Sequence, residues 1–326
     1  MSVLSITNAY HPKAKRGATF NEEIVFPYQT AIAYEKEGVY YALGPGTPII
    51  FSEKNPSISI KDWLKGTFGS TTFHEIHIIP GTYFKRIWKP GLANFNSLKT
   101  VTDQEVLNQS SVSLRILLRK LNELFEVVEP NTINLSVYGH SIRELLLLAC
   151  MEVESSWSAV LREHNYSTKT ENRWNTSDYI KLLDPMLLKF YAASLRAYPQ
   201  CPKFKPFENW DVSDATKSLC WYDAYNKTKH NREKYLKEAT LQNTIEAVMA
   251  AVIMYRAQFG PRFKYHWMSP GDVDDDIREM FDIDMSAVHQ QVSEFYVPDV
   301  IWTDGNRGEK IASPCQTWNA VNCNLN

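Results

Sequence analysis

The chain has 326 residues, of which 44% are hydrophobic and 22% are charged, and these are ordinary values for globular proteins. The composition excludes a collagen-like or wholly disordered chain, and the length allows two folding units with full cores. Thirty-five Lys and Arg residues stand against 37 Asp and Glu residues, giving a formal net charge of −2. No global excess of positive charge therefore drives binding to nucleic acid.

Three features of the sequence predict a cytoplasmic protein without membrane contact. The longest apolar run, Leu145 to Cys150, is far shorter than the ~20 residues that cross a bilayer. Residues 1–17 lack the apolar core of a secretory signal. The five cysteines are odd in number and widely spaced without a CxxC pair, which is typical of reduced thiols rather than of disulfides or zinc ligands.

The first predicted segment, residues 1–101, carries β-like patterns. Short β-prone runs begin at Val39 and Ile49, and a turn cluster rich in Gly and Pro separates them. A third run, residues 73–79, ends at Pro80-Gly81, which is a strong turn signal. We therefore expect a small β-rich or mixed module in this part of the chain.

From about residue 102 the apolar residues recur at helical spacing. Between residues 114 and 128, successive apolar residues are three or one positions apart in the sequence. This spacing predicts an amphipathic helix that ends at Pro130. A second stripe, from Ile142 to Val160, predicts a second helix. Residues 178–191 are expected to form a third helix, interrupted at Pro185.

The remainder of the middle region begins with an irregular stretch. Three prolines between Tyr198 and Trp210 exclude a regular helix there and favour an extended loop or hairpin. A long helical region is then expected from about Asp214 to Phe259, where Gly260-Pro261 ends it. Residues 102–260 are thus predicted to be an antiparallel helical bundle.

The last predicted segment, residues 261–326, is an acidic C-terminal extension. It holds 11 acidic and 5 basic residues, a difference of −6, which leaves +4 for residues 1–260 given the total of −2. The asymmetry directs an anionic partner to the body of the protein rather than to this extension. The three segments together predict an α+β fold that is predominantly α.

Residues 221–235, WYDAYNKTKHNREKY, are the most informative segment for function. They surround one histidine, His230, with four basic side chains: Lys227, Lys229, Arg232 and Lys234. On one continuous helix, Asn226, Lys227, His230 and Lys234 would share a face. A histidine can move a proton there while lysines hold the negative charge of a phosphate. The alternative is a solvated basic helix face with an incidental histidine.

Three parts of residues 102–260 resemble the HEPN superfamily, helical-bundle domains of prokaryotic toxins, RNA-processing enzymes and defence proteins. They are the helix at residues 141–155, the loop Tyr198 to Trp210, and residues 222–232. In nuclease members the active site is an arginine, a polar residue, three variable positions and a histidine. Asn226 and His230 occupy the polar and histidine positions, whereas Tyr225 stands at the arginine position.

The resemblance implies an RNA-binding protein, and a metal-independent endoribonuclease in a defence or toxin setting if the site is intact. His230 would then activate the ribose 2′-hydroxyl or protonate the leaving oxygen, while Asn226 would orient a phosphate oxygen. Lys227 or Lys229 would stabilise the developing charge. The 2′-hydroxyl is the nucleophile, so no metal or other cofactor is required and DNA is not a substrate.

The remaining basic residues of the segment, Arg232 and Lys234, are expected to contact RNA as well. Tyr225 is expected either to bind substrate by stacking on a base or to pack in the core or at an interface. The resemblance further implies a homodimer in which two histidine helices face each other, with Trp221 or Tyr225 near the seam. A phenol cannot supply the charge of the missing arginine. The alternative function is therefore a non-catalytic protein–protein interaction module with a degenerate HEPN site.

Overall fold

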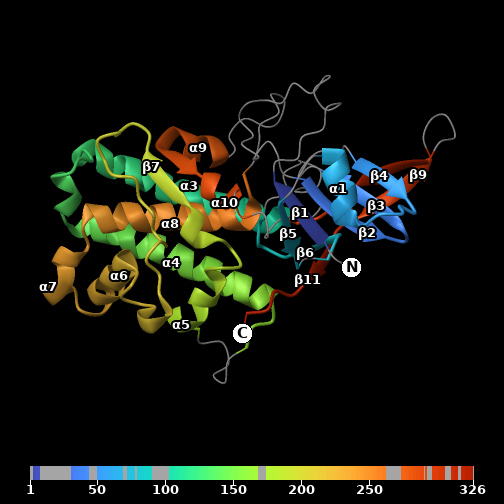
Figure 1. The fold of residues 1–326 in the computed structure, drawn as a ribbon. Coiled ribbons are helices and arrows are strands. Elements are labelled where there is room, and N and C mark those ends of the chain that lie inside the picture. Colours follow the sequence, from blue (N-terminus) through green and yellow to red (C-terminus); the bar gives the residue numbers. More distant parts are fainter. Residues whose placement is uncertain are drawn as a thin grey trace. The chain divides into compact units, whose positions relative to one another are not determined.

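In the computed structural model the chain forms two compact units (Figure 1), and we describe each by itself. The sheet unit contains residues 1–84, 89–101 and 286–321, and the helical unit contains residues 85–88, 102–285 and 322–326. The structure describes residues 3–7, 31–43, 50–68, 72–77, 79–89, 103–167, 174–261, 273–289, 291, 296–304, 310–314 and 317–325. The fold is α+β and predominantly α.

The sheet unit is built on a five-stranded antiparallel sheet in the order β4-β3-β2-β1-β5. Its strands are β1 (Val3–Thr7), β2 (Ala31–Lys36), β3 (Val39–Leu43), β4 (Ile50–Lys54) and β5 (Thr72–Ile76). Glu37 and Gly38 join β2 to β3 with positive φ angles of 54° and 73°, respectively. Two consecutive positive φ angles suit the tight turn of a two-residue hairpin and fix the pairing of Lys36 with Val39.

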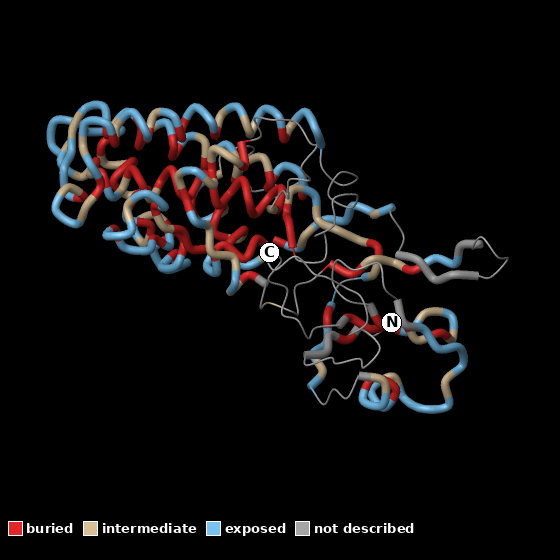
Figure 2. The backbone as a smooth tube through the Cα atoms, turned by 90° about the horizontal axis from the view of Figure 1, so that it is seen from above, coloured by how far each residue is buried: buried red, intermediate tan, exposed pale blue. Residues whose placement is uncertain are grey.

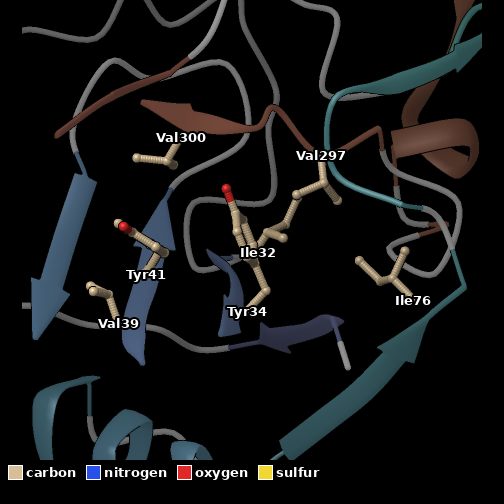
Figure 3. Packing of buried hydrophobic residues seen from close by; sticks show 7 residues of the cluster. All are labelled: Ile32, Tyr34, Val39, Tyr41, Ile76, Val297 and Val300. Carbon is tan, nitrogen blue, oxygen red and sulfur yellow. The ribbon is translucent and has the colours of Figure 1, made fainter. Parts of the chain in front are cut away.

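Alternate residues of β2 and β3 enter two different cores, as the period of a strand requires. Helix α1 (Ile60–Phe68) supplies Trp63 and Leu64 to one core, where they pack with Ala33 and Ala42. The other core joins the opposite face of the sheet to residues 297–300 (Figure 3). Its members are Ile32, Tyr34, Val39, Tyr41, Ile76, Val297 and Val300.

Four further strands among the described residues complete the sheet unit. They are β6 (Thr82–Phe84), β9 (Val300–Asp304), β10 (Lys310–Pro314) and β11 (Asn319–Val321). Strands β9 and β10 form an antiparallel pair, and β11 pairs in parallel with β6. The predicted runs near Val39, Ile49 and residues 73–79 thus correspond to β3, β4 and β5, whereas β1, β2 and α1 were not predicted.

The helical unit contains three long helices, α3 (Gln104–Val127), α4 (His140–Glu163) and α8 (Leu241–Phe259), which pack against one another. These helices confirm the predicted stripes at residues 114–128 and 142–160 and the predicted end at Gly260. Helix α8 is buried on almost every side, which explains why it is apolar around its whole circumference. Buried residues accordingly fill the middle of this unit, and exposed residues cover its outer turns (Figure 2).

The predicted continuous helical region from Asp214 to Phe259 is wrong, because the chain breaks it into several pieces. These are η4 (Val212–Asp214), α6 (Cys220–His230), α7 (Arg232–Tyr235), η5 (Leu236–Glu238) and α8. At Asn231 the backbone leaves the helical region, and its side chain accepts a hydrogen bond from the Lys234 N–H at 3.1 Å. Thr240 caps α8 in the same way. Such side chains offer the backbone an alternative to a continuous helix.

The predicted helix at residues 178–191 is also wrong in extent. The chain forms only α5 (Thr176–Tyr179), η2 (Ile180–Leu182) and η3 (Leu188–Phe190) there. Pro185 and a left-handed Leu187, with φ 55°, separate these turns. The irregular stretch from Tyr198 to Trp210 is confirmed, and Phe204 forms a bridge with Ala193 of β7 (Ala192–Leu195).

Residues 261–326 contribute to both units rather than to a segment of their own. The helical unit receives α9 (Val273–Met280) and β8 (Phe281–Asp284), which pairs with β7, and the sheet unit receives α10 (Ser286–His289). The acidic side chains of α9 form ion pairs with arginines: buried Asp274 with Arg256, Asp275 with Arg278, and Asp276 with Arg115. Among the described helices, none combines the length and apolar character that a membrane span requires.

Candidate functional site

The structure brings Asn226, Lys229 and His230 together on the last turns of α6. Asn226 is half-buried, while Lys229 and His230 are exposed at the end of the helix. Residues three or four positions apart lie on one face of a helix, so both side chains are neighbours of Asn226. The expected pairing of Asn226 with His230 is therefore compatible with the local geometry.

The two lysines of this turn have different surroundings. Lys227 donates to the carboxylate of Asp223 at 2.6 Å, and this contact raises the pKa of Lys227. Lys229 instead donates to the hydroxyl of Tyr225 at 2.8 Å, and its ammonium lies 4.8 Å from the centroid of the Tyr225 ring. The hydrogen bond to Tyr225 raises the pKa of Lys229, so this ammonium stays charged at neutral pH.

Arg232 and Lys234 lie beyond the break at Asn231, on the short helix α7. Both side chains are exposed, and the Lys234 ammonium lies 4.9 Å from the centroid of the Tyr235 ring. The expectation that Lys234 continues the face of Asn226 and His230 on one helix is wrong, because α6 ends before α7 begins. The basic segment therefore presents its cations from two helices that meet at a bend.

Of the two roles expected for Tyr225, the structure shows packing in the core and not an exposed ring that could stack on a base. Its side chain is only 1% exposed, because it is packed inside the helical unit. Trp221 is also 1% exposed and donates from Nε1 to the Pro206 carbonyl at 2.9 Å. Both rings are therefore unavailable to a base, and also to a dimer seam. Of the aromatic residues in the segment, only Tyr235 is half-buried.

Glu154 of α4 is the site residue that the sequence reasoning missed. Its carboxylate accepts hydrogen bonds from the hydroxyl of Tyr222 and from the hydroxyl of Tyr225, the latter at 3.3 Å. Burial, together with these contacts to Glu154, raises the pKa of Tyr222, and burial raises the pKa of Tyr225. Both phenols therefore stay protonated and act as donors. No local pattern predicts this contact, because α4 and α6 are far apart in the sequence.

Further contacts fix α6 against the rest of the helical unit. Arg143 of α4 donates from Nε and Nη2 to the Thr228 carbonyl, at 3.2 and 2.9 Å, which satisfies an end carbonyl of α6. Near the start of α6, Trp157 stacks on Trp210 with ring centroids 5.0 Å apart and contacts Trp221 at 6.2 Å. Contacts at both ends thus hold α6 in place, including its last turn, which carries Lys229 and His230.

The basic residues at the end of α6 also have a structural explanation. Cations in the last turn of a helix interact favourably with the negative end of the helix dipole. This effect accounts for a lysine there without a ligand, and it applies to Lys229. Within the described parts of the chain, no group of three or more His, Cys, Asp or Glu residues is placed to hold a metal ion.

Comparison with known proteins gives little further information. No family model matches the chain, and no solved structure matches it. A curated protein described as Serpin B10, from Rhinolophus ferrumequinum, is 26% identical over 155 residues. The match covers 47% of this chain and 34% of that protein, so the chain spans about a third of the length of the curated relative. This likeness shows no family and identifies no site residue.

Proposed function

We propose that the helical unit is HEPN-like and binds RNA through the basic segment from Asn226 to Lys234. One observation carries the proposal: exposed Lys229, His230, Arg232 and Lys234 gather where α6 meets α7. Clustered basic side chains form a locally positive surface that can bind a phosphate backbone, although the protein as a whole is slightly acidic. Because Trp221 and Tyr225 are buried, recognition relies on backbone phosphates rather than on stacked bases.

The same segment supplies the groups for metal-independent cleavage. In this reaction His230 takes the proton of a ribose 2′-hydroxyl as that oxygen attacks the neighbouring phosphorus. The bond from phosphorus to the 5′ oxygen breaks, and the leaving oxygen takes a proton from solvent water, which yields a 2′,3′-cyclic phosphate and a 5′-hydroxyl. The half-buried Asn226 orients a phosphate oxygen from its place one turn away. DNA lacks the attacking hydroxyl and is not cleaved.

Cleavage is tested with the full-length protein and total RNA in EDTA. We expect the wild type to cut RNA and His230→Ala to lose the activity by roughly 10²–10⁴-fold, the usual contribution of a general acid or base. His74→Ala removes an exposed histidine of the sheet unit and serves as the matched control. Equal cleavage by the wild type and His230→Ala, or none by either, would end the catalytic part of the proposal.

Binding is tested separately by titrating a labelled single-stranded RNA at several salt concentrations. Binding through several cations should weaken steeply with salt, because each phosphate contact releases counterions. An interaction module that recognises a partner protein through apolar faces shows no such RNA titration. Absence of binding at low salt would therefore reject the RNA proposal and favour the interaction module.

A further inference from the structure

We infer that Lys229, positioned by Tyr225 and Glu154, is the phosphate-binding cation that replaces the arginine of this site. The inference rests on the proposed RNA binding and specifies which group contacts the phosphodiester. The sequence leaves Lys227 and Lys229 as equal candidates for that role. Their contacts in the structure separate them.

Lys227 is the weaker candidate because its charge is already paired. The Asp223 carboxylate lies 2.6 Å from its ammonium, one turn earlier on α6. An RNA phosphate would have to compete with this carboxylate for the same cation. The neighbouring carboxylate would also repel the phosphate, so Lys227 adds little net attraction for an anion.

Lys229 has a neutral hydrogen-bond partner instead of a carboxylate. Its ammonium donates to the Tyr225 hydroxyl at 2.8 Å, and among the described residues no carboxylate lies within ion-pair distance of it. A lysine ammonium carries three donors, so this one contact leaves two for a ligand. The exposed side chain can present them to a phosphate while remaining anchored at Tyr225.

Glu154 orients the Tyr225 hydroxyl, to which the Lys229 ammonium is hydrogen-bonded. The Tyr225 hydroxyl directs its proton to the Glu154 carboxylate at 3.3 Å, so its oxygen is left to accept from Lys229. The Tyr222 hydroxyl also donates to Glu154 and holds the carboxylate in place. The tyrosine at the arginine position therefore supplies no charge itself, but it positions the charge of the lysine one turn later.

The position of Lys229 around the helix suits a phosphate that is also bound by Asn226 and His230. Successive residues of an α-helix are rotated by about 100°, so Asn226 lies about 60° from Lys229 and about 40° from His230. A phosphate on the Asn226 amide would thus meet the ammonium on one side and the imidazole on the other. Because an ammonium is a point charge without a planar fork, it selects phosphodiesters without reading bases.

The test compares full-length variants in titrations of a labelled single-stranded RNA across a salt series. Lys229→Ala should weaken binding about tenfold, as expected for loss of a charge-assisted hydrogen bond. It should also flatten the slope of log affinity against log salt by about 0.7, the value for one phosphate contact on a single strand. Lys229→Arg should restore the slope because it keeps the charge.

Two further variants separate positioning from charge. Tyr225→Phe keeps the buried ring but removes the hydroxyl, so we expect weaker binding with an unchanged salt slope. Lys227→Ala should change the slope less than Lys229→Ala does. Lys217→Ala, an exposed lysine paired with Asp214, is the matched control. Thermal unfolding of each variant verifies that the fold is intact.

The possible failures are distinguishable. If the wild type does not bind RNA, the proposed function and this assignment both fall. If the wild type binds but Lys229→Ala has the same slope as the wild type, only the assignment is overturned. It is also overturned if Lys227→Ala flattens the slope as much as Lys229→Ala, or if Tyr225→Phe binds as tightly as the wild type.

Discussion

At the scale of single residues, His164 shows how one imidazole can join distant parts of the helical unit. It is 5% exposed and lies just after α4. Its Nδ1 accepts a hydrogen bond from the Cys323 N–H at 3.1 Å, so Nε2 carries the proton and donates to the Lys85 carbonyl at 3.0 Å. Only the neutral ring can make both bonds, since a protonated ring has no acceptor.

The stability of the helical unit should therefore depend on pH through His164. Burial lowers the pKa of His164 in the folded state; the contacts with the Lys85 carbonyl and Glu163 oppose this shift, and the Lys85 charge adds to it. The unfolded chain then binds more protons, and stability rises with pH. The contribution is fully present above the unfolded pKa of ~6.5 and is lost as pH falls through the folded pKa.

We expect urea unfolding of the wild type to show this loss of stability below about pH 6.5. His164→Asn retains an acceptor near Nδ1 but does not titrate in this range, so its stability should fall less over the same interval. Hydrogen exchange of the Cys323 amide, corrected for its intrinsic pH dependence, provides a local readout. Parallel pH profiles for the two proteins would contradict the assignment.

At the scale of secondary-structure elements, the end of α8 depends on a glycine. Gly260 follows the last helical residue with φ 73°, and its N–H donates to the Arg256 carbonyl at 2.8 Å. A Cβ at this position would overlap the indole of Trp88. The backbone N–H of Trp88 in turn donates to the Ala257 carbonyl at 2.7 Å, so residues 85–88 are held against the last turn of α8.

Gly260→Ala should reduce the free energy of unfolding by about 2–5 kcal/mol. The estimate combines the strain of a residue with a side chain at this φ with the overpacking of Trp88. Gly139→Ala is the matched control, because a Cβ there meets no atom within 4 Å and its φ is extended. The control should lose less than about 1 kcal/mol. Equal losses in chemical denaturation would show that the cap is not the cause.

At the scale of the whole molecule, the resemblance to HEPN domains leads us to expect a homodimer. Two facing copies of the basic segment would enclose an RNA strand and double the local positive charge. Without an anion between them the facing lysines repel, so other contacts must hold the pair. Trp221 and Tyr225 do not supply those contacts, since both are buried within one chain.

Light scattering or sedimentation should therefore give a mass of about twice 37.6 kDa at micromolar concentration. The measurement is made in low salt, with and without a single-stranded RNA, because the anion relieves the repulsion of the facing cations. A mass equal to one chain under both conditions would contradict the dimer. Binding of RNA by a single chain would remain measurable in that case.

Elements with a local cause can be predicted from the amino-acid sequence. The apolar spacing of α3, α4 and α8 predicts each helix, because a 3.6-residue period can place one side of a helix in a core. Pro130 and Gly260 predict two helix ends, since proline and a positive φ oppose continuation. Strands β3 and β4 could also be predicted, because their β-prone residues are consecutive in the sequence.

Features that depend on partners distant in sequence could not be predicted and emerge from the packing of the folded chain. Asn231 fits either a helix or a cap, and the packing of the surrounding elements selects the cap that separates α6 from α7. Strand β11 pairs with β6 although more than 230 residues separate them. The burial of Tyr225 and its contact with Glu154 likewise arise where α4 packs on α6. Sequence periodicity marks which face of each helix is apolar, but the register between two packed helices depends on both surfaces at once. That register places Glu154 against Tyr225, whereas the partners that distinguish Lys227 from Lys229 lie one turn earlier on α6 itself.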